Sequence, residues 1–471
     1  MKKISILAVV LACVFGAAQA KVTLPSVLGS NMVLQRNTDV NLWGTAEANK
    51  NVKITASWTK EKFSVKADKD GKWTTTIPTV DAGGPYTLTF DDGEKTELTN
   101  ILLGEVWVCS GQSNMEMPVG GYMYQPVDGA LEHIKEACKY SDIRMFTVPR
   151  CTSNTLQEDC DTMWRESSPM TVRTFSAAAY FFGKELQKML NVPVGLITAN
   201  WGGTRIEAWM SKESLDGVEG RNVSYDKKYR GPNANNVLYN GMIHPISKFT
   251  AKGFIWYQGC TNVGRHEQYR RLQMSFVKML REKWGNDEMA FYFTQIAPYM
   301  YDDPNAREAA FLMWTQAQTL NRIRHSGMAV THDIGEEVCI HPAKKKEVGD
   351  RLAFLALSKK YNQRFFDADP PIADKFEFTD GKAIVTFKVS NFGVGPIKKD
   401  LEGFEVAGED KVFYPAVARV STKDYKVIEV SCPEVPNPVA VRYGMRNWSK
   451  ASVFSHYGIP ASPFRSDDWE K

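Results

Sequence analysis

Residues 105–115 have the sequence Glu-Val-Trp-Val-Cys-Ser-Gly-Gln-Ser-Asn-Met, in which a short apolar run ends in a polar turn. The run predicts a buried strand, and the turn places Ser113 where a strand gives way to a helix. A serine in this position can act as a nucleophile, with backbone N–H groups at the start of the helix aimed at a developing oxyanion. The turn differs from the α/β-hydrolase elbow because Met115 stands where the second glycine belongs. A plain turn or N-cap serine is the alternative.

Apolar strands and helical stretches alternate on the C-terminal side of this turn. Amphipathic helices are expected at residues 176–190 and 267–284, among others, and further strands are expected at residues 194–198, 253–257, 290–293 and 328–331. Such alternation predicts a parallel sheet covered by helices on both faces, with ligands at the carboxyl ends of the strands. We therefore expect an α/β domain over residues 101–365.

The two flanks of this domain have a different pattern. Residues 21–100 consist of short strand-like runs separated by turn signals such as Asp68-Lys69-Asp70-Gly71, which is typical of a small β-sandwich. Residues 366–471 show the same kind of runs with Gly and Pro breaks. The expected order is therefore an N-terminal β domain, the α/β domain and a C-terminal β domain.

The first twenty residues have the three parts of a secretory signal. Lys2 and Lys3 precede an apolar run over residues 4–16, and Ala18-Gln19-Ala20 supplies small residues for cleavage. We predict a signal peptide over residues 1–20 with cleavage after Ala20, and hence export to the periplasm or the extracellular space. No second apolar run of about 18 residues follows, so no membrane-spanning segment is expected.

The net charge of the chain is too small to indicate binding to nucleic acid or to a membrane surface. The 471 residues include 58 Lys and Arg against 54 Asp and Glu, for a net charge of +4. The Cys and His spacing offers no convincing zinc site, and no metal or organic cofactor is expected.

Polar segments follow three more of the predicted strands. Gly202 and Gly203 allow a close backbone approach to a ligand, although paired glycines often form only a turn. Asn262 can offer a side-chain N–H to an oxyanion, and nearby Trp256 either stacks on a sugar or packs in the core. His341 is a candidate general base for Ser113, with His244 as the main rival.

The order Ser, Gly, Asn, His at successive strand ends resembles the SGNH hydrolases, and within them the sialate O-acetylesterase family of carbohydrate esterases. Four segments carry the resemblance: residues 110–115, 202–209, 256–262 and 340–342. Flanking segments, such as Trp43-Gly44-Thr45 and residues 458–465, also match, so the resemblance spans nearly the whole mature chain. It implies a flavodoxin-like SGNH domain flanked by β-sandwich-like domains.

The resemblance also implies roles for individual residues. Ser113 would attack an acetyl carbonyl, and His341 would take its proton and later protonate the leaving sugar hydroxyl. The oxyanion hole would comprise the Ser113 N–H, the N–H of Gly202 or Gly203, with Gly203 preferred, and the Asn262 side chain. The implied substrate-binding residues are Gln112, Asn114, Arg205 and Gln258.

The implied substrate is an O-acetylated sugar or glycan, with O-acetylated sialic acid preferred. Plant hemicellulose or another acetylated polysaccharide is the alternative, because the same four segments would serve any acetylated sugar. Arg205 and Arg265 are candidates for contact with a sialic acid carboxylate. A non-catalytic carbohydrate-binding protein is a third possibility, against which the presence of both Ser113 and His341 argues.

The chain departs from the family pattern at two cysteines. Many relatives have a carboxylate at the positions of Cys260 and Cys339, so we hypothesise a Cys260–Cys339 disulfide that fixes the histidine loop. The acid of a triad is then open: Glu336 and Glu337 are nearby, and a backbone carbonyl can orient the base instead. We expect Asp333 to be structural. Among the other cysteines, Cys151 and Cys160 are able to close a loop, and Cys109 is expected to be a buried free thiol.

Overall fold

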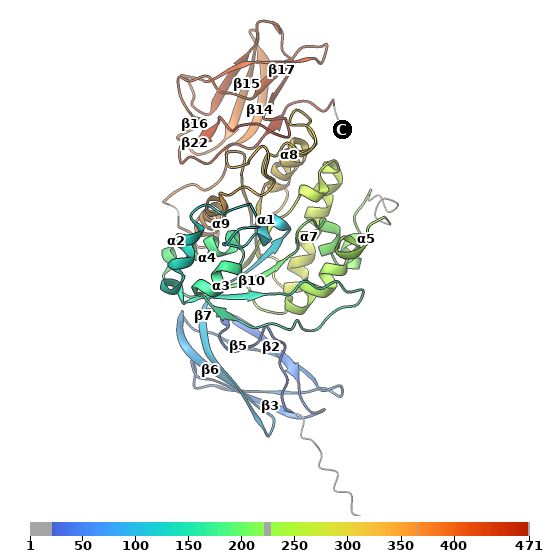
Figure 1. Ribbon diagram of the computed structural model, residues 1–471, viewed down its shortest axis with the longest axis vertical. Helices are drawn as coiled ribbons and strands as arrows, with labels where there is room; N and C mark the ends of the chain where they lie inside the picture. Colours follow the sequence, from blue (N-terminus) through green and yellow to red (C-terminus); the bar gives the residue numbers. More distant parts are fainter. Residues whose placement is uncertain (1–20, 221–227, 364, 470–471) are drawn as a thin grey trace, which may run out of the picture.

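The computed structural model describes residues 21–220, 228–363 and 365–469. The predicted signal peptide lies outside the described residues. Three parts follow one another along the long axis of the molecule: an N-terminal β region, a central α/β region and a C-terminal β region (Figure 1). This is the order expected from the sequence. None of the described helices is both long and apolar enough to cross a membrane.

The central sheet contains six parallel strands and one short antiparallel edge strand, β9 (Arg165–Glu166). The parallel strands lie in the order β13 (Ser326–Ala329), β12 (Ala290–Thr294), β11 (Gly253–Tyr257), β7 (Lys95–Gly111), β10 (Val194–Asn200) and β8 (Ile143–Thr147). The first of them in the chain, β7, therefore lies between β10 and β11. The polar turn that follows β7 is consequently at the middle of the sheet, where the connections diverge to either side.

Five adjacent parallel strands follow the 2-1-3-4-5 order of a flavodoxin-like sheet: β10, β7, β11, β12 and β13. The difference is an additional strand, β8, which precedes β10 in the chain and pairs with its outer edge. The alternation of strands and helices predicted the parallel sheet, but it did not predict the strand at residues 143–147.

Helices cover both faces of the sheet. Helices α4 (Ala177–Leu190) and α9 (Lys345–Lys359) pack together on one face, and α7 (His266–Trp284) and α8 (Glu308–Leu320) lie on the other (Figure 1). Successive side chains of β7 alternate between these faces, so Trp107 and Cys109 join one buried cluster and Val106 and Val108 the other. Cys109 is a buried free thiol, as expected. The short helices are α1 (Ser113–Glu116), α2 (Ala130–Lys135), α3 (Pro169–Thr174) and α5 (Lys212–Asp216).

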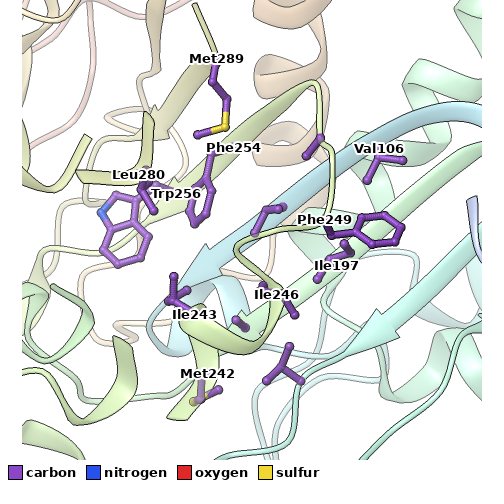
Figure 2. Close-up of a cluster of buried hydrophobic side chains, with 14 of the residues drawn as sticks. Val106, Ile197, Met242, Ile243, Ile246, Phe249, Phe254, Trp256, Leu280 and Met289 are labelled. Atoms are coloured by element: carbon purple, nitrogen blue, oxygen red, sulfur yellow. The ribbon is translucent and has the colours of Figure 1, made fainter. Parts of the chain in front are cut away.

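Figure 2 shows the apolar cluster on the α7 face of the sheet. Phe254 and Trp256 of β11 lie beside Leu280 of α7, and the segment from Met242 to Phe249 lies against Val106 and Ile197. Trp256 is completely buried. It therefore packs in the core, and the interpretation in which it stacks on a sugar does not hold.

The N-terminal region is continuous with the central sheet. It contains β1 (Val33–Gln35), β2 (Asp39–Thr45), β3 (Asn51–Ala56), β4 (Lys62–Lys66), β5 (Lys72–Pro78) and β6 (Gly83–Asp91). The first part of β7 pairs with β1 and β6, whereas its last residues pair with β10 and β11. The boundary expected at residue 100 thus falls inside a single strand that joins the two regions.

The C-terminal region contains two four-stranded antiparallel sheets and one small strand pair. The first sheet has the order β14 (Ile372–Thr379), β15 (Lys382–Lys388), β20 (Val427–Ser431), β19 (Val417–Val420). The second has the order β18 (Phe413–Pro415), β17 (Phe404–Ala407), β21 (Ala440–Tyr443), β23 (Phe464–Arg465), and the pair is β16 (Val394–Gly395) with β22 (Phe454–Ser455). Side chains of both large sheets share one buried cluster. This region contacts the central domain through His332, which lies just past β13.

Candidate active site

The turn after β7 is held by a close contact with the neighbouring strand. Gly111 has φ +153, and a Cβ at this position would lie 2.2 Å from the Tyr257 carbonyl oxygen, so only glycine fits. The next amide, of Gln112, donates to the same Tyr257 oxygen at 3.0 Å. This contact ends the strand and starts α1 at Ser113, which is partly exposed at the carboxyl edge of the sheet.

Ser113 and His341 form the hydrogen bond that the sequence predicts. The Ser113 Oγ lies 2.8 Å from Nε2 of His341, and Nδ1 of the same ring lies 2.7 Å from Oε1 of Gln125. Since an amide oxygen only accepts, Nδ1 carries the proton and donates to Gln125, which leaves Nε2 free to accept from the serine hydroxyl. The result is a chain from nucleophile to base to orienting group, with an amide in the third place.

Tyr122 supports both catalytic candidates. Its ring packs edge-on against the His341 ring, with a centroid separation of 5.2 Å, and its hydroxyl donates to the Ser113 carbonyl oxygen at 3.0 Å. The segment from Tyr122 to Gln125 therefore covers one side of the pair. This segment follows no strand, so the strand-end pattern of the sequence does not mark it.

His341 is neutral over most of the pH range. Burial and, to a lesser degree, the positive charge of Lys345 lower the pKa of His341 to about 4. A neutral imidazole is the form that can accept the proton of Ser113. In the part of the chain that the structure describes, no carboxylate contacts the ring to stabilise its charged form.

A buried lysine joins the histidine loop to the nucleophile turn. Lys345 is 1% exposed, and its Nζ donates to Oδ1 of Asn114 at 2.8 Å and to the Pro342 carbonyl oxygen at 2.6 Å. The amide group of Asn114 in turn donates to the Ile340 carbonyl oxygen at 2.9 Å. Burial lowers the pKa of Lys345 to about 7, although nearby Cys339, Glu336 and Cys260 favour its charged form. Asn114, predicted to bind substrate, is 1% exposed and is engaged in this clamp.

The two glycines after β10 differ in what their amides can do. The Gly202 N–H donates to Oε2 of Glu116 at 2.8 Å. Gly203 is exposed and has φ +70, and within the described parts of the chain no acceptor takes its N–H. Of the two candidates for the oxyanion hole, Gly203 is thus the one with an available donor.

Asn262 is fixed by a buried polar network. Its Oδ1 accepts from the Ile206 amide at 3.2 Å and from Nε2 of Gln258 at 2.8 Å, and its Nδ2 donates to Oε2 of Glu207 at 3.0 Å. Glu207 pairs with Arg265 at 2.5 Å. Burial opposes the charge on Glu207, but the charges of Arg265 and Arg205 bring its pKa below the ordinary value. The second Nδ2 hydrogen of Asn262 takes no part in this network, and the side chain is completely buried.

The other predicted substrate-binding side chains are buried and bonded to protein. Gln112 accepts from the Gly259 amide at 2.9 Å, and Gln258 donates to the Thr204 carbonyl oxygen at 3.1 Å. Arg205 is completely buried, where it bonds the Asn233 carbonyl oxygen at 2.8 Å and lies 4.0 Å from the centre of the Tyr229 ring. These contacts tie the strand-end loops to each other.

The predicted disulfide between Cys260 and Cys339 is absent from the structure, so this prediction is wrong. Cys260 and Cys339 are free thiols, as are Cys151 and Cys160. The sulfur of Cys339 donates to the His341 carbonyl oxygen at 3.3 Å, while that of Cys260 lies beside the Tyr301 hydroxyl. The two thiols thus have different partners, and the loop is fixed instead by Lys345 and Asn114.

The carboxylates near His341 in the sequence do not reach its ring. Asp333 forms a two-pronged ion pair with Arg351 at 2.6 and 2.7 Å, which is the structural role expected for it. Glu336 accepts from the Ala343 amide at 2.7 Å and so shapes the loop. The rival histidine, His244, faces Glu158 at 3.7 Å rather than Ser113. Among the described residues, no group of three or more His, Cys, Asp or Glu side chains is arranged to hold a metal.

Comparison with known proteins agrees with this geometry. Residues 103–358, more than half of the chain, match the family described as carbohydrate esterase, sialic acid-specific acetylesterase. The chain belongs to this family. Membership makes it a carbohydrate esterase, and the Ser113–His341 pair is consistent with that chemistry. The prediction of an esterase is confirmed.

Relatives of this family member resemble it over almost their whole length. The sialate O-acetylesterases of Pongo abelii and Homo sapiens are each 28% identical to the chain over 487 residues, covering 93% of this chain and 91% of the relative. The solved structure of a carbohydrate acetylesterase from Xanthomonas citri is 32% identical, with a TM-score of 0.87, and the match covers 95% of this chain and 100% of the other.

Proposed function

We propose that this carbohydrate esterase removes O-acetyl groups from sialic acids through an acetyl-enzyme formed on Ser113. The observation that carries the mechanism is the 2.8 Å contact between Ser113 Oγ and His341 Nε2, with the histidine held from behind by Gln125. The choice of sialic acid is supported by the sialate O-acetylesterases to which the chain is similar.

In the first half of the reaction, Ser113 attacks the acetyl carbonyl carbon while His341 takes the hydroxyl proton. The C–O bond to the sugar then breaks, and the imidazolium of His341 returns its proton to the departing sugar oxygen. In the second half a water molecule attacks the acetyl-serine with the same histidine as base, and acetate leaves as Ser113 regains its proton. Gln125 keeps the ring in one tautomer throughout.

The negative charge of the tetrahedral intermediate would be held by three donors. These are the backbone N–H of Ser113, the N–H of Gly203 and the remaining Nδ2 hydrogen of Asn262. The Gly202 N–H already donates to Glu116, so Gly203 is favoured as the second donor. The Glu207 network fixes the Asn262 amide before substrate arrives, and such preorganisation is what makes an oxyanion hole effective.

We also propose the cellular setting and the domain roles. The lysine-led apolar segment at residues 1–20 directs export, so the enzyme acts on glycans in the periplasm or outside the cell. The α/β region serves as an SGNH-type catalytic domain, and the two β regions serve as sandwich-like flanking domains.

Acetate release tests the proposal. The wild type and Ser113→Ala are compared on 9-O-acetylated sialic acid, acetylated xylan and an aryl acetate. We expect release from the sialic acid that depends on Ser113. Equal slow release by both proteins on every substrate would contradict the esterase mechanism. A strong preference for xylan would move the substrate to acetylated hemicellulose.

A further inference from the structure

Arg150 is an exposed cation at the rim of the site. It lies shortly after the end of β8 and is not one of the site residues expected from the sequence. Its side chain is 54% exposed, and its guanidinium lies 5.5 Å from the centre of the Trp201 ring. Trp201 directly precedes Gly202 and is partly exposed.

One edge of the Arg150 guanidinium is occupied, and the other has no hydrogen-bond partner among the described residues. Its Nε and Nη2 contact the same oxygen of Glu116, at 2.7 and 2.6 Å. A guanidinium has five N–H donors, so three remain, on Nη1 and on the outer side of Nη2. Because the side chain is half exposed, these donors are available for the two-pronged contact by which a guanidinium binds a carboxylate.

This guanidinium lies next to the nucleophile. Glu116 belongs to the same short helix as Ser113, and its second oxygen accepts the Gly202 N–H at 2.8 Å. A Cβ placed on Gly202 would be 3.1 Å from the Cβ of Ser113 and 3.2 Å from Oε2 of Glu116. Burial raises the pKa of Tyr122, and among the charges that act on it Glu116 raises the pKa further while Arg150 lowers it. Arg150 is therefore within electrostatic range of the residues that surround His341.

Three other basic side chains near the site are less accessible to a ligand. Arg205 is completely buried, and the Arg265 side chain is 13% exposed and paired with Glu207. Lys345 is buried in the clamp between Asn114 and Pro342. Of these four basic side chains, Arg150 is the most exposed to a substrate anion arriving from solvent.

We propose that Arg150 and Trp201 form the subsite for a carboxylate-bearing sugar, in which the open edge of Arg150 binds the carboxylate and Trp201 packs against the sugar ring. This assignment rests on the proposed function and specifies which residues give it a preference for an acidic sugar. It replaces Arg205 and Arg265 as the carboxylate contacts. The Trp201 backbone is suited to such a platform because its N–H bonds the Gly111 oxygen at 3.1 Å and its carbonyl accepts from Thr204 Oγ1 at 2.6 Å.

The test compares two forms of one substrate. Acetate release is measured on 9-O-acetylated sialic acid with a free carboxylate and on its methyl ester, which removes the charge and adds only a methyl group. The proteins are the wild type, Arg150→Gln, Arg150→Lys and Arg419→Gln. Arg419 is the matched control because it forms an exposed ion pair with Asp400 in the C-terminal region.

We expect the wild type to prefer the free carboxylate, through a lower KM. A charged hydrogen bond at a half-exposed site supports a preference of about tenfold in kcat/KM. Arg150→Gln should abolish the preference, Arg150→Lys should keep part of it because the charge remains without the two-pronged contact, and Arg419→Gln should keep all of it. The ratio of the two substrates is the readout, since loss of Arg150 also alters Glu116 and the Gly202 turn.

Two outcomes would overturn the assignment. One is a wild type that hydrolyses both forms equally well, and the other is an Arg150→Gln protein that loses the same factor on both, which would give Arg150 a purely structural role. Either result leaves Ser113-dependent acetate release intact, so the proposed function stands. Failure of the wild type to release acetate from any sugar would instead remove the proposed function and this subsite with it.

Discussion

Oε1 of Gln125 lies 2.7 Å from Nδ1 of His341, so a neutral amide holds the catalytic base where a carboxylate is customary. The amide fixes the tautomer and the direction of the ring, but it adds no negative charge to stabilise the imidazolium. Burial and the Lys345 charge are then unopposed, which accounts for a His341 pKa near 4. His341 is therefore a weaker base than a histidine paired with a carboxylate, but it stays neutral in mildly acidic surroundings.

Exchanging this amide for a carboxylate should change the pH profile. In Gln125→Glu the new charge faces His341 and should raise its pKa by about one to three units. Since only neutral His341 accepts the serine proton, the acid limb of kcat/KM should move to higher pH by the same amount. The measurement is acetate release from an aryl acetate between pH 3.5 and 8.

Tyr124→Glu is the control for that exchange. It adds the same charge one residue away, on a side chain that is 95% exposed. Its acid limb should stay close to that of the wild type, because solvent screens the charge. An unmoved limb in Gln125→Glu would mean that Gln125 is not the partner of His341.

The positive charge of Lys345 should also affect the pH at which the acid limb of kcat/KM falls. In the range where His341 titrates Lys345 is protonated, and its charge lowers the His341 pKa. Lys345→Met removes the charge while keeping an apolar stem, so the His341 pKa should rise and the acid limb should move upward. The loss of the bond to Asn114 should also lower kcat, because the histidine loop is no longer tied to the Ser113 turn.

Lys346→Met separates this effect from a general change in charge. Lys346 is the exposed neighbour of Lys345 and pairs with Asp350 on the outer side of α9. Its pH profile should match the wild type. If both variants shift the limb equally, a specific Lys345 contribution is refuted.

Ser113 and His341 should be equally essential. Nucleophile and base act as a unit, so we expect Ser113→Ala and His341→Ala each to lower kcat by about a thousandfold or more, with little further loss in the double variant. His244→Ala should retain activity, since His244 faces Glu158. Single-turnover acetate release is measured for all four variants, and a comparable loss in His244→Ala would be evidence against our choice of base.

The residues that could be predicted from the sequence are those that follow strands. Ser113, Gly203, Asn262 and His341 each come after an apolar run, and parallel strands bring such positions to one edge. Gln125 could not be found in this way, because it is 216 residues from His341 and lies in a loop that no periodic pattern marks. Lys345 appears in the sequence as one of several lysines at the start of a helix, and only the packing of α9 buries it.

The errors have a similar origin. Arg205 follows a glycine pair, which suggests an exposed loop, but the fold places it beneath Asn233 and Tyr229. The disulfide was inferred from two cysteines in converging loops, whereas side-chain direction decides whether their sulfurs meet. Strand β8 was not predicted either, because its five residues are a short run that includes Arg144 and Thr147.

His332 should make stability depend on pH through the contact between the α/β and C-terminal regions. Its Nε2 lies 2.8 Å from Ser449 Oγ, and its Nδ1 lies 3.3 Å from the Ala461 carbonyl oxygen. Burial lowers the pKa of His332 from 6.5 to about 4. Between these values the unfolded chain binds the proton and the folded chain does not, so stability falls as the pH drops from about 6.5 towards 4.

The full effect of this histidine is on the order of 3 kcal/mol, from a difference of about 2.5 pKa units. His332→Gln does not titrate, so its urea midpoint should fall less between pH 7.5 and 4.5 than that of the wild type. His456 is an exposed ring stacked on Phe392, so the urea midpoint of His456→Gln should fall with pH as steeply as that of the wild type. If the urea midpoints of the wild type and His332→Gln fall equally between pH 7.5 and 4.5, the acid sensitivity of the fold arises from other groups.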